Sequence, residues 1–168
     1  MRSLLLFLHI VGFGLWFGVS FSVGMYAGRA RATGDRSLMA FHYAAAARLL
    51  TKPGLAGIIL TTVSGFELTR IGGFGYFALT PHWLFQMQVL GVLAAILSAS
   101  VQIPVARRLA SGYGIEPEGA STGVAMAVEA SAADEPSLAK LRRVNAIVGS
   151  AVGLLLLIVV YLGVSRAF

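Results

Sequence analysis

Four long apolar stretches, separated by polar segments, dominate the pattern of the chain. Each is close to the roughly 20 residues with which a helix crosses the hydrocarbon core of a bilayer. Backbone amides find partners in hydrocarbon only within a helix or a closed barrel, and the alternation of a barrel strand is absent from the sequence. We therefore predict an all-α fold, a four-transmembrane-helix bundle in a single integral membrane domain. The predicted spans are residues 4–26, 53–69, 83–105 and 144–164.

Two long connections, residues 27–52 and 106–143, join these spans. The segment from Ser37 to Leu50 has high helix propensity and mixed polarity. It predicts an additional interfacial helix before the second span, or the beginning of one long second helix that Pro53 kinks or divides. In the other connection we expect a flexible loop, with a short helix near residues 124–130. A helix start follows, with Asp134 as its cap and Pro136 in its first turn.

Charge indicates the orientation of the bundle. Only 12% of the residues are charged, against about 25% in soluble domains. The net charge of +6 does not indicate nucleic-acid binding, because the basic residues flank apolar runs. Ten of the 13 Lys and Arg residues lie in the two long connections: Arg29, Arg31, Arg36, Arg48, Lys52, Arg107, Arg108, Lys140, Arg142 and Arg143. Both connections are therefore predicted to be cytoplasmic, with both termini outside.

The first span carries one ionisable side chain, His9, well inside its apolar run. Intramembrane histidines usually face the interior of a bundle. On a helical wheel His9 shares a face with Gly12 and Trp16, so a glycine beside the histidine would leave room for a flat cofactor. Gly14 and Gly18 lie on the opposite face, where a second helix or a second copy of the chain could approach closely. A histidine hydrogen-bonded to a neighbouring helix, or one that transfers protons, would fit the same pattern.

The predicted topology brings other polar residues to the level of His9. His82 begins the third helix on the same side, just before its predicted span, Met87 lies at a similar depth, and Glu67 lies near the end of the second span. Such a set suits a b-type haem with bis-His or His/Met ligation. A metal ion held by His9, His82 and Glu67 is the alternative. Structural roles are also open: an interface position for His82, core filling for Met87, and an ion pair with Arg70 for Glu67.

Several further features have more than one interpretation. Gln86, Gln88 and Gln102 could line a quinone or solute site, or could form hydrogen bonds between helices. A stripe of small residues on the second span indicates helix packing: Gly54, Gly57, Thr61, Ser64 and Gly65. His42 is predicted to lie at the interface. The chain has no cysteine, and it lacks the nucleotide-binding, zinc-protease and serine-hydrolase motifs of soluble enzymes.

The opening L-H-I-V-G-x-x-x-W-x-G, residues 8–18, resembles the first helix of a group of small bacterial membrane proteins. The group comprises an uncharacterised family of predicted four-helix proteins, the copper-resistance D domain and the HemJ-type protoporphyrinogen oxidases. The second span, P-G-L-x₄-L-x₃-S-G from Pro53, and a third helix that ends in P-x-x-R-R resemble the uncharacterised family. The resemblance implies the bacterial inner membrane, haem b with His9 as a ligand, or copper handling. The HemJ type also uses a lysine in a later helix, whereas the lysines here are Lys52 and Lys140.

These observations predict a small b-type haem-binding membrane protein for electron transfer or haem-linked redox chemistry. Its cofactor-binding residues would be His9, His82, Gly12, Trp16 and Met87. Partners would be the lipid bilayer and a membrane electron-transfer protein or quinone. The alternative is a non-enzymatic structural subunit, or one that transports copper or another transition metal through His9, His82 and Glu67. The sequence leaves open whether the chain is an enzyme.

Overall fold

A computed structural model describes residues 1–113 and 135–165, and it confirms the all-α four-helix bundle. Helix α1 spans Arg2–Thr33, α2 spans Arg36–Leu49 and α3 spans Leu55–Ile71. Helix α4 spans His82–Leu97, α5 spans Ile103–Gly112 and α6 spans Glu135–Val164. Within the described residues, four continuous helical rods are long and apolar enough to cross a membrane, and α2–α3 and α4–α5 each form one of them.

The second rod is a single long helix from Arg36 to Ile71, so the segment before the second span is its beginning. Asp35 starts it: its carboxylate accepts hydrogen bonds from the backbone N–H groups of Ser37 at 2.8 Å and Leu38 at 3.4 Å. These bonds, chiefly the one from Ser37, stabilise the charged form and lower the pKa of the Asp35 carboxyl. The helix therefore begins with the arrangement that is typical of an acidic N-cap.

Two π-helical turns, η1 (Leu50–Gly54) and η2 (Ser98–Gln102), interrupt the second and third rods. Pro53 lies inside the first turn and Pro104 follows the second. Proline lacks an amide hydrogen and its ring clashes with the carbonyl four residues earlier, so a wider turn lets the helix continue past it. Pro53 thus neither ends the helix nor starts a new one. Pro136 lies in the first turn of α6 as predicted, whereas Asp134 and the predicted helix near residues 124–130 lie outside the described residues.

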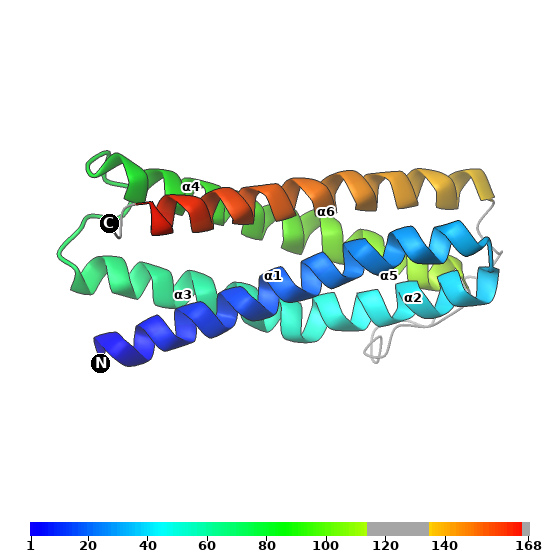
Figure 1. Cartoon of the computed structure of the whole chain (residues 1–168), viewed down its shortest axis with the longest axis horizontal. Helices are drawn as coiled ribbons and strands as arrows, with labels where there is room; N and C mark the ends of the chain where they lie inside the picture. Colours follow the sequence, from blue (N-terminus) through cyan, green and yellow to red (C-terminus); the bar gives the residue numbers. More distant parts are fainter. Residues whose placement is uncertain (114–134, 166–168) are drawn as a thin grey trace, which may run out of the picture.

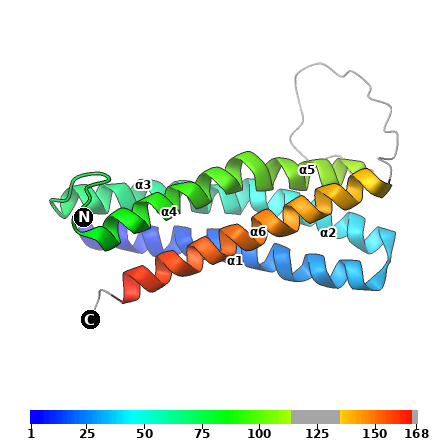
Figure 2. The same ribbon diagram turned by 90° about the horizontal axis from the view of Figure 1, so that it is seen from above.

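The rods lie side by side along the long axis of the molecule (Figure 1). The beginning of α1, the α3–α4 connection and the end of α6 lie together at one end, which we call the terminal end. The α1–α2 turn and the start of α6 lie at the other, the basic end. Helix α1 packs mainly on α3, and α4 on α6, whereas α3 and α4 barely touch. Figure 2 shows α6 crossing α1 at an angle.

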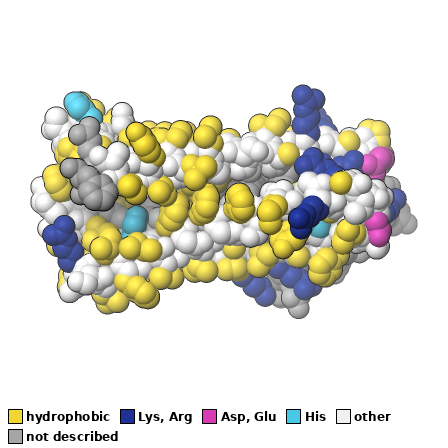
Figure 3. Space-filling view, in the orientation of Figure 1, with side chains coloured by type: hydrophobic (Ala, Val, Ile, Leu, Met, Phe, Trp, Pro, Cys, Tyr) yellow, Lys and Arg dark blue, Asp and Glu magenta, His cyan; other side chains and the backbone are white. Residues whose placement is uncertain are grey.

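The surface has the distribution expected of a membrane protein. Apolar side chains cover the middle of the molecule, and the face in Figure 3 carries most of its Lys and Arg toward the basic end. Most large apolar residues of α1, such as Phe7, Ile10 and Phe21, are exposed, which suits contact with lipid. His42, in contrast, is buried beside Tyr43 and faces the interior of the bundle, and its position at the membrane interface stays a prediction.

Candidate functional site

His9 lies where α1 crosses α3 near the terminal end. Its Nδ1 is 2.9 Å from the carbonyl oxygen of Thr61. A carbonyl can only accept, so Nδ1 carries the hydrogen and donates it to Thr61. The Ser64 hydroxyl, which donates to the carbonyl of Leu60, lies 3.4 Å from the same nitrogen. In the neutral ring Nε2 then keeps its lone pair, and the described part of the chain provides no hydrogen-bond partner for it.

Glycines allow this arrangement. A Cβ at Gly65 would lie 2.9 Å from Cε1 of the His9 ring, so only a residue without a side chain leaves space for the imidazole. A Cβ at Gly12 would lie 2.8 Å from the backbone nitrogen of Thr61, and one at Gly57 would lie 2.7 Å from the carbonyl oxygen of Gly12. The two helix backbones therefore touch at Gly12 and Gly57. Gly12 makes room for α3 here, not for a ligand.

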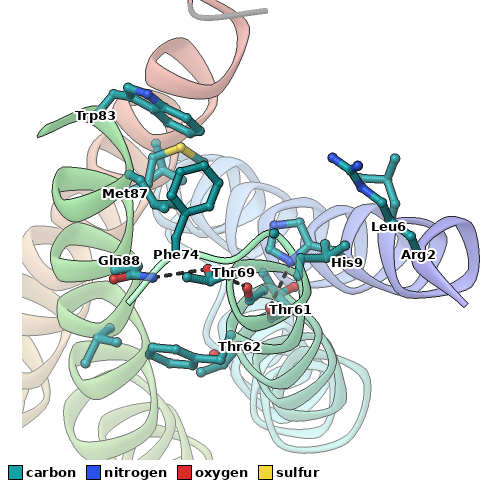
Figure 4. A pocket seen from close by; sticks show the side chains of 18 of the residues that line it. Arg2, Leu6, His9, Thr61, Thr62, Thr69, Phe74, Trp83, Met87 and Gln88 are labelled. Atoms are coloured by element: carbon teal, nitrogen blue, oxygen red, sulfur yellow. Dashed lines mark hydrogen bonds between the residues drawn. The ribbon is translucent and has the colours of Figure 1, made fainter. Parts of the chain in front are cut away.

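A cavity of about 380 Å³ adjoins His9 between the α1–α3 pair and the α4–α6 pair. Figure 4 shows the His9 ring on one side of it and Met87 and Trp83 on the other, with Phe74 from the α3–α4 connection between them. Arg2 lines the cavity and is exposed, as is Phe74, so the cavity opens at the terminal end. Its walls are mainly aromatic and aliphatic, with few polar groups, which is typical of small-molecule sites.

Gln88 closes the polar edge of this cavity. Its Nε2 donates to the Thr69 hydroxyl at 3.1 Å, and its Oε1 accepts from the backbone N–H of Phe77 at 2.7 Å. Thr69 in turn donates to the carbonyl of Gly65 at 3.0 Å. Gln88 thereby joins α4 to α3 and to the loop between them, where the two helices otherwise barely touch. The sequence left two roles open for Gln88, lining a ligand site or forming hydrogen bonds between helices. These bonds show that it forms interhelical hydrogen bonds.

Trp16 forms the inner boundary of the cavity. It is 2% exposed, and its indole N–H donates to the hydroxyl of Ser98 in η2 at 3.1 Å. It belongs to an apolar layer across the middle of the bundle, which consists of Trp16, Ile58, Ala94, Val152 and Leu156. Trp16 thus faces the interior as predicted, with its polar atom used in packing.

The remaining predicted residues divide between the cavity and the surface. Met87 lines the cavity together with His9. His82, the first residue of α4, is exposed and does not line it. Glu67 forms an ion pair with Arg70 at 2.8 Å on the surface. Among the described residues no three His, Asp or Glu side chains lie close enough to hold a metal ion. The His9–His82–Glu67 set is therefore not assembled in this structure.

Sequence reasoning did not assign a functional role to Thr61 or Gly65. Both belong to the small-residue stripe that packs against α1, but the same stripe orients the His9 ring. Gly14 and Gly18 are exposed, and a Cβ at either would meet nothing within 4 Å. They are free for an external helix, so their role in oligomer formation stays a prediction.

No protein-family model matches the chain, and neither a curated protein nor a solved structure shows significant similarity to it. The resemblance to small bacterial four-helix proteins therefore stays a prediction. A functional assignment for the chain must rest on the geometry around His9.

Proposed function

We propose that this chain is a small integral membrane protein that binds a b-type haem in the cavity beside His9, for electron transfer or haem-linked redox chemistry. The observation that carries the proposal is the Nδ1–H···O=C bond from His9 to Thr61. Histidines that ligate a metal usually donate the other ring N–H to a carbonyl or carboxylate, which sets the tautomer and the direction of the free nitrogen. His9 has this arrangement, with Nε2 available.

The types of residue that line the cavity suit such a group. His9 Nε2 offers an imidazole ligand, and Met87 offers a thioether in the same cavity, which makes the His/Met alternative better supported than bis-His ligation. Phe66, Phe74 and Trp83 supply walls against which a flat macrocycle can lie. Arg2 at the mouth can pair with a carboxylate of the ligand.

In this proposal the protein orients the His9 imidazole and excludes water from the cavity. Bound haem supplies one-electron chemistry at its iron. Thr61 holds the His9 ring in one tautomer, Gly65 gives the ring its space, and the Trp16 layer separates the cavity from the rest of the bundle.

Protein purified in mild detergent from haem-replete cells is expected to show a Soret band, with about one haem per chain by pyridine haemochromogen assay. The imidazole ligand and the apolar walls give the expected result its physical basis. A folded, helical protein without bound haem would contradict the proposal.

We further propose that the terminal end faces outward from a bacterial cytoplasmic membrane, since the basic end would be retained on the cytoplasmic side. A phosphatase reporter, active only outside the cytoplasm, is expected to be active when fused after residue 168 and inactive when fused at residue 119. The reverse pattern would place the His9 cavity on the cytoplasmic side.

A further inference from the structure

A second cavity, of about 700 Å³, lies mainly between α1 and α6 in the basic half of the bundle. Along α1 it involves residues from Phe17 onward to Arg31, and along α6 it involves residues from Arg142 to Leu157. The His9 cavity involves Trp16 and earlier residues of α1, and Val159 of α6. The two cavities therefore occupy successive halves of the bundle. Phe21 and Leu154 line the second cavity and are exposed, so it opens toward lipid.

Three buried polar side chains line this second cavity without a partner. Ser20 is 5% exposed, Gln102 1% and Asn145 6%. Ser20 Oγ, Gln102 Oε1 and Asn145 Oδ1 have no hydrogen-bond partner within the described ranges, 1–113 and 135–165. A buried polar atom without a partner is unfavourable, so nearly all such atoms in proteins are paired with protein, water or a ligand. The three residues line one cavity, but these oxygens have almost no accessible surface, so a bound molecule supplies the missing hydrogen bonds only when the side chains turn toward it.

The backbone brings these groups together. Gln102 is the last residue of the π-helical turn η2, and its Nε2 lies 3.6 Å from where a Cβ of Gly149 on α6 would be. Helix α6 thus presents no side chain at this point, and the Gln102 amide reaches the α1–α6 cavity beside it. Ser20 approaches from α1 and Asn145 from α6, one turn closer to the basic end than Gly149.

The chemistry of the lining points to a neutral ligand. Hydroxyl and carboxamide groups together both donate and accept hydrogen bonds, so they can bind a carbonyl or a hydroxyl. Among the described residues, the charged side chains of the lining are Arg31 and Arg142 at the basic end, and Arg142 already bonds to the Tyr113 hydroxyl at 2.7 Å and to Glu135. The stacked rings of Phe17 and Phe21, with centroids 6.0 Å apart, add an aromatic wall.

We propose that this cavity, built by Ser20, Gln102 and Asn145, is a binding site for a quinone or quinol that enters from the bilayer. On binding, these three side chains turn toward the cavity and bond to the ring oxygens. The ring lies against Phe17 and Phe21, and the apolar tail extends past Leu154 into lipid. Ring oxygens satisfy the groups in either redox form, since a quinone carbonyl accepts and a quinol hydroxyl both donates and accepts. The site is separate from the His9 cavity and does not depend on haem.

Equilibrium dialysis tests this site, using a radiolabelled benzoquinone with a ten-carbon alkyl tail and protein in phosphatidylcholine nanodiscs. We expect saturable binding of one molecule per chain. Gln102→Leu and Asn145→Leu keep the side-chain size, and each is expected to weaken binding about tenfold, as for one buried hydrogen bond. Because each change removes an unpartnered polar atom, the melting temperature is expected to stay the same or rise, which separates lost binding from lost folding.

Ser100→Ala is the matched control. Ser100 belongs to the same π-helical turn, but it is exposed and bonds to the carbonyl of Ile96 in its own helix. This variant is expected to bind the probe like the wild type. Absence of saturable binding to the wild type would overturn the proposal, as would unchanged binding to Gln102→Leu and Asn145→Leu. The readout requires no haem, so this proposal and that for the His9 cavity can fail independently.

Discussion

Replacing His9 with alanine is expected to remove bound haem, lowering the Soret absorbance per chain by at least tenfold. The only imidazole that lines the cavity, within the described residues, is then lost, and Met87 alone provides no comparable ligand. The variant also loses the His9–Thr61 hydrogen bond, so its helix content and melting temperature should be measured beside the spectrum. The expected variant is folded and colourless.

His82→Ala provides the matched control for this experiment. His82 is also a histidine at the terminal end, but it is exposed and stands outside the cavity. Its replacement is expected to leave haem content and the Soret position unchanged. Loss of haem in both variants would instead support the bis-His arrangement that the sequence suggested, and retention in both would exclude His9 as the ligand.

Gly57→Ala is expected to destabilise the bundle by about 2 kcal/mol. The added Cβ would lie 2.7 Å from both the Gly12 carbonyl oxygen and the Trp16 amide nitrogen, which are backbone atoms that no rotamer change can move. Helices α1 and α3 would have to separate, at about 3 kcal/mol for such overpacking. The higher helix propensity of alanine returns about 1 kcal/mol. Reversible unfolding in mixed micelles measures the difference.

Gly14→Ala, the control for Gly57→Ala, changes a glycine of the same close-packed helix pair where nothing lies within 4 Å. It is expected to leave the free energy of unfolding unchanged or to raise it by up to about 1 kcal/mol through helix propensity. Equal destabilisation by the two changes would mean that the α1–α3 crossing is not at Gly12 and Gly57. A Gly14→Ala effect confined to the oligomeric state would instead indicate an external helix on that face.

The number, order and approximate position of the spans could be predicted, because hydrocarbon requires long apolar helices. The ends of the helices were harder to predict from the sequence. Helix α1 continues to Thr33, past its apolar run, because the structure ends it at Gly34 with a positive φ of 68°. The continuity of α2 and α3 depends on a wider turn around Pro53, which propensity alone does not predict.

The candidate site could be predicted from the sequence only in part. His9 stands out in the sequence, as the one ionisable group within its span, and Met87 is predictable at its depth. A predicted depth does not show which side chains line the cavity, however: His82 is the first residue of α4 and is exposed outside it. The hydrogen-bond partner of His9 is a backbone carbonyl, and every residue has one, so the sequence cannot indicate it. The need for glycine at Gly65 arises only from the angle at which α1 and α3 cross, which brings the His9 ring against it.

The sparse contact between α3 and α4 affects how a ligand can enter the His9 cavity. At the terminal end, the side-chain hydrogen bonds of Gln88 tie α4 to α3 and to the loop between them, whereas the Trp16 layer holds the same rods together deeper in the membrane. Breaking two hydrogen bonds exposes far less apolar surface than separating a packed helix pair. We therefore expect the helices to separate more readily at the terminal end than at the Trp16 layer, which would let a planar ligand enter while every helix stays folded.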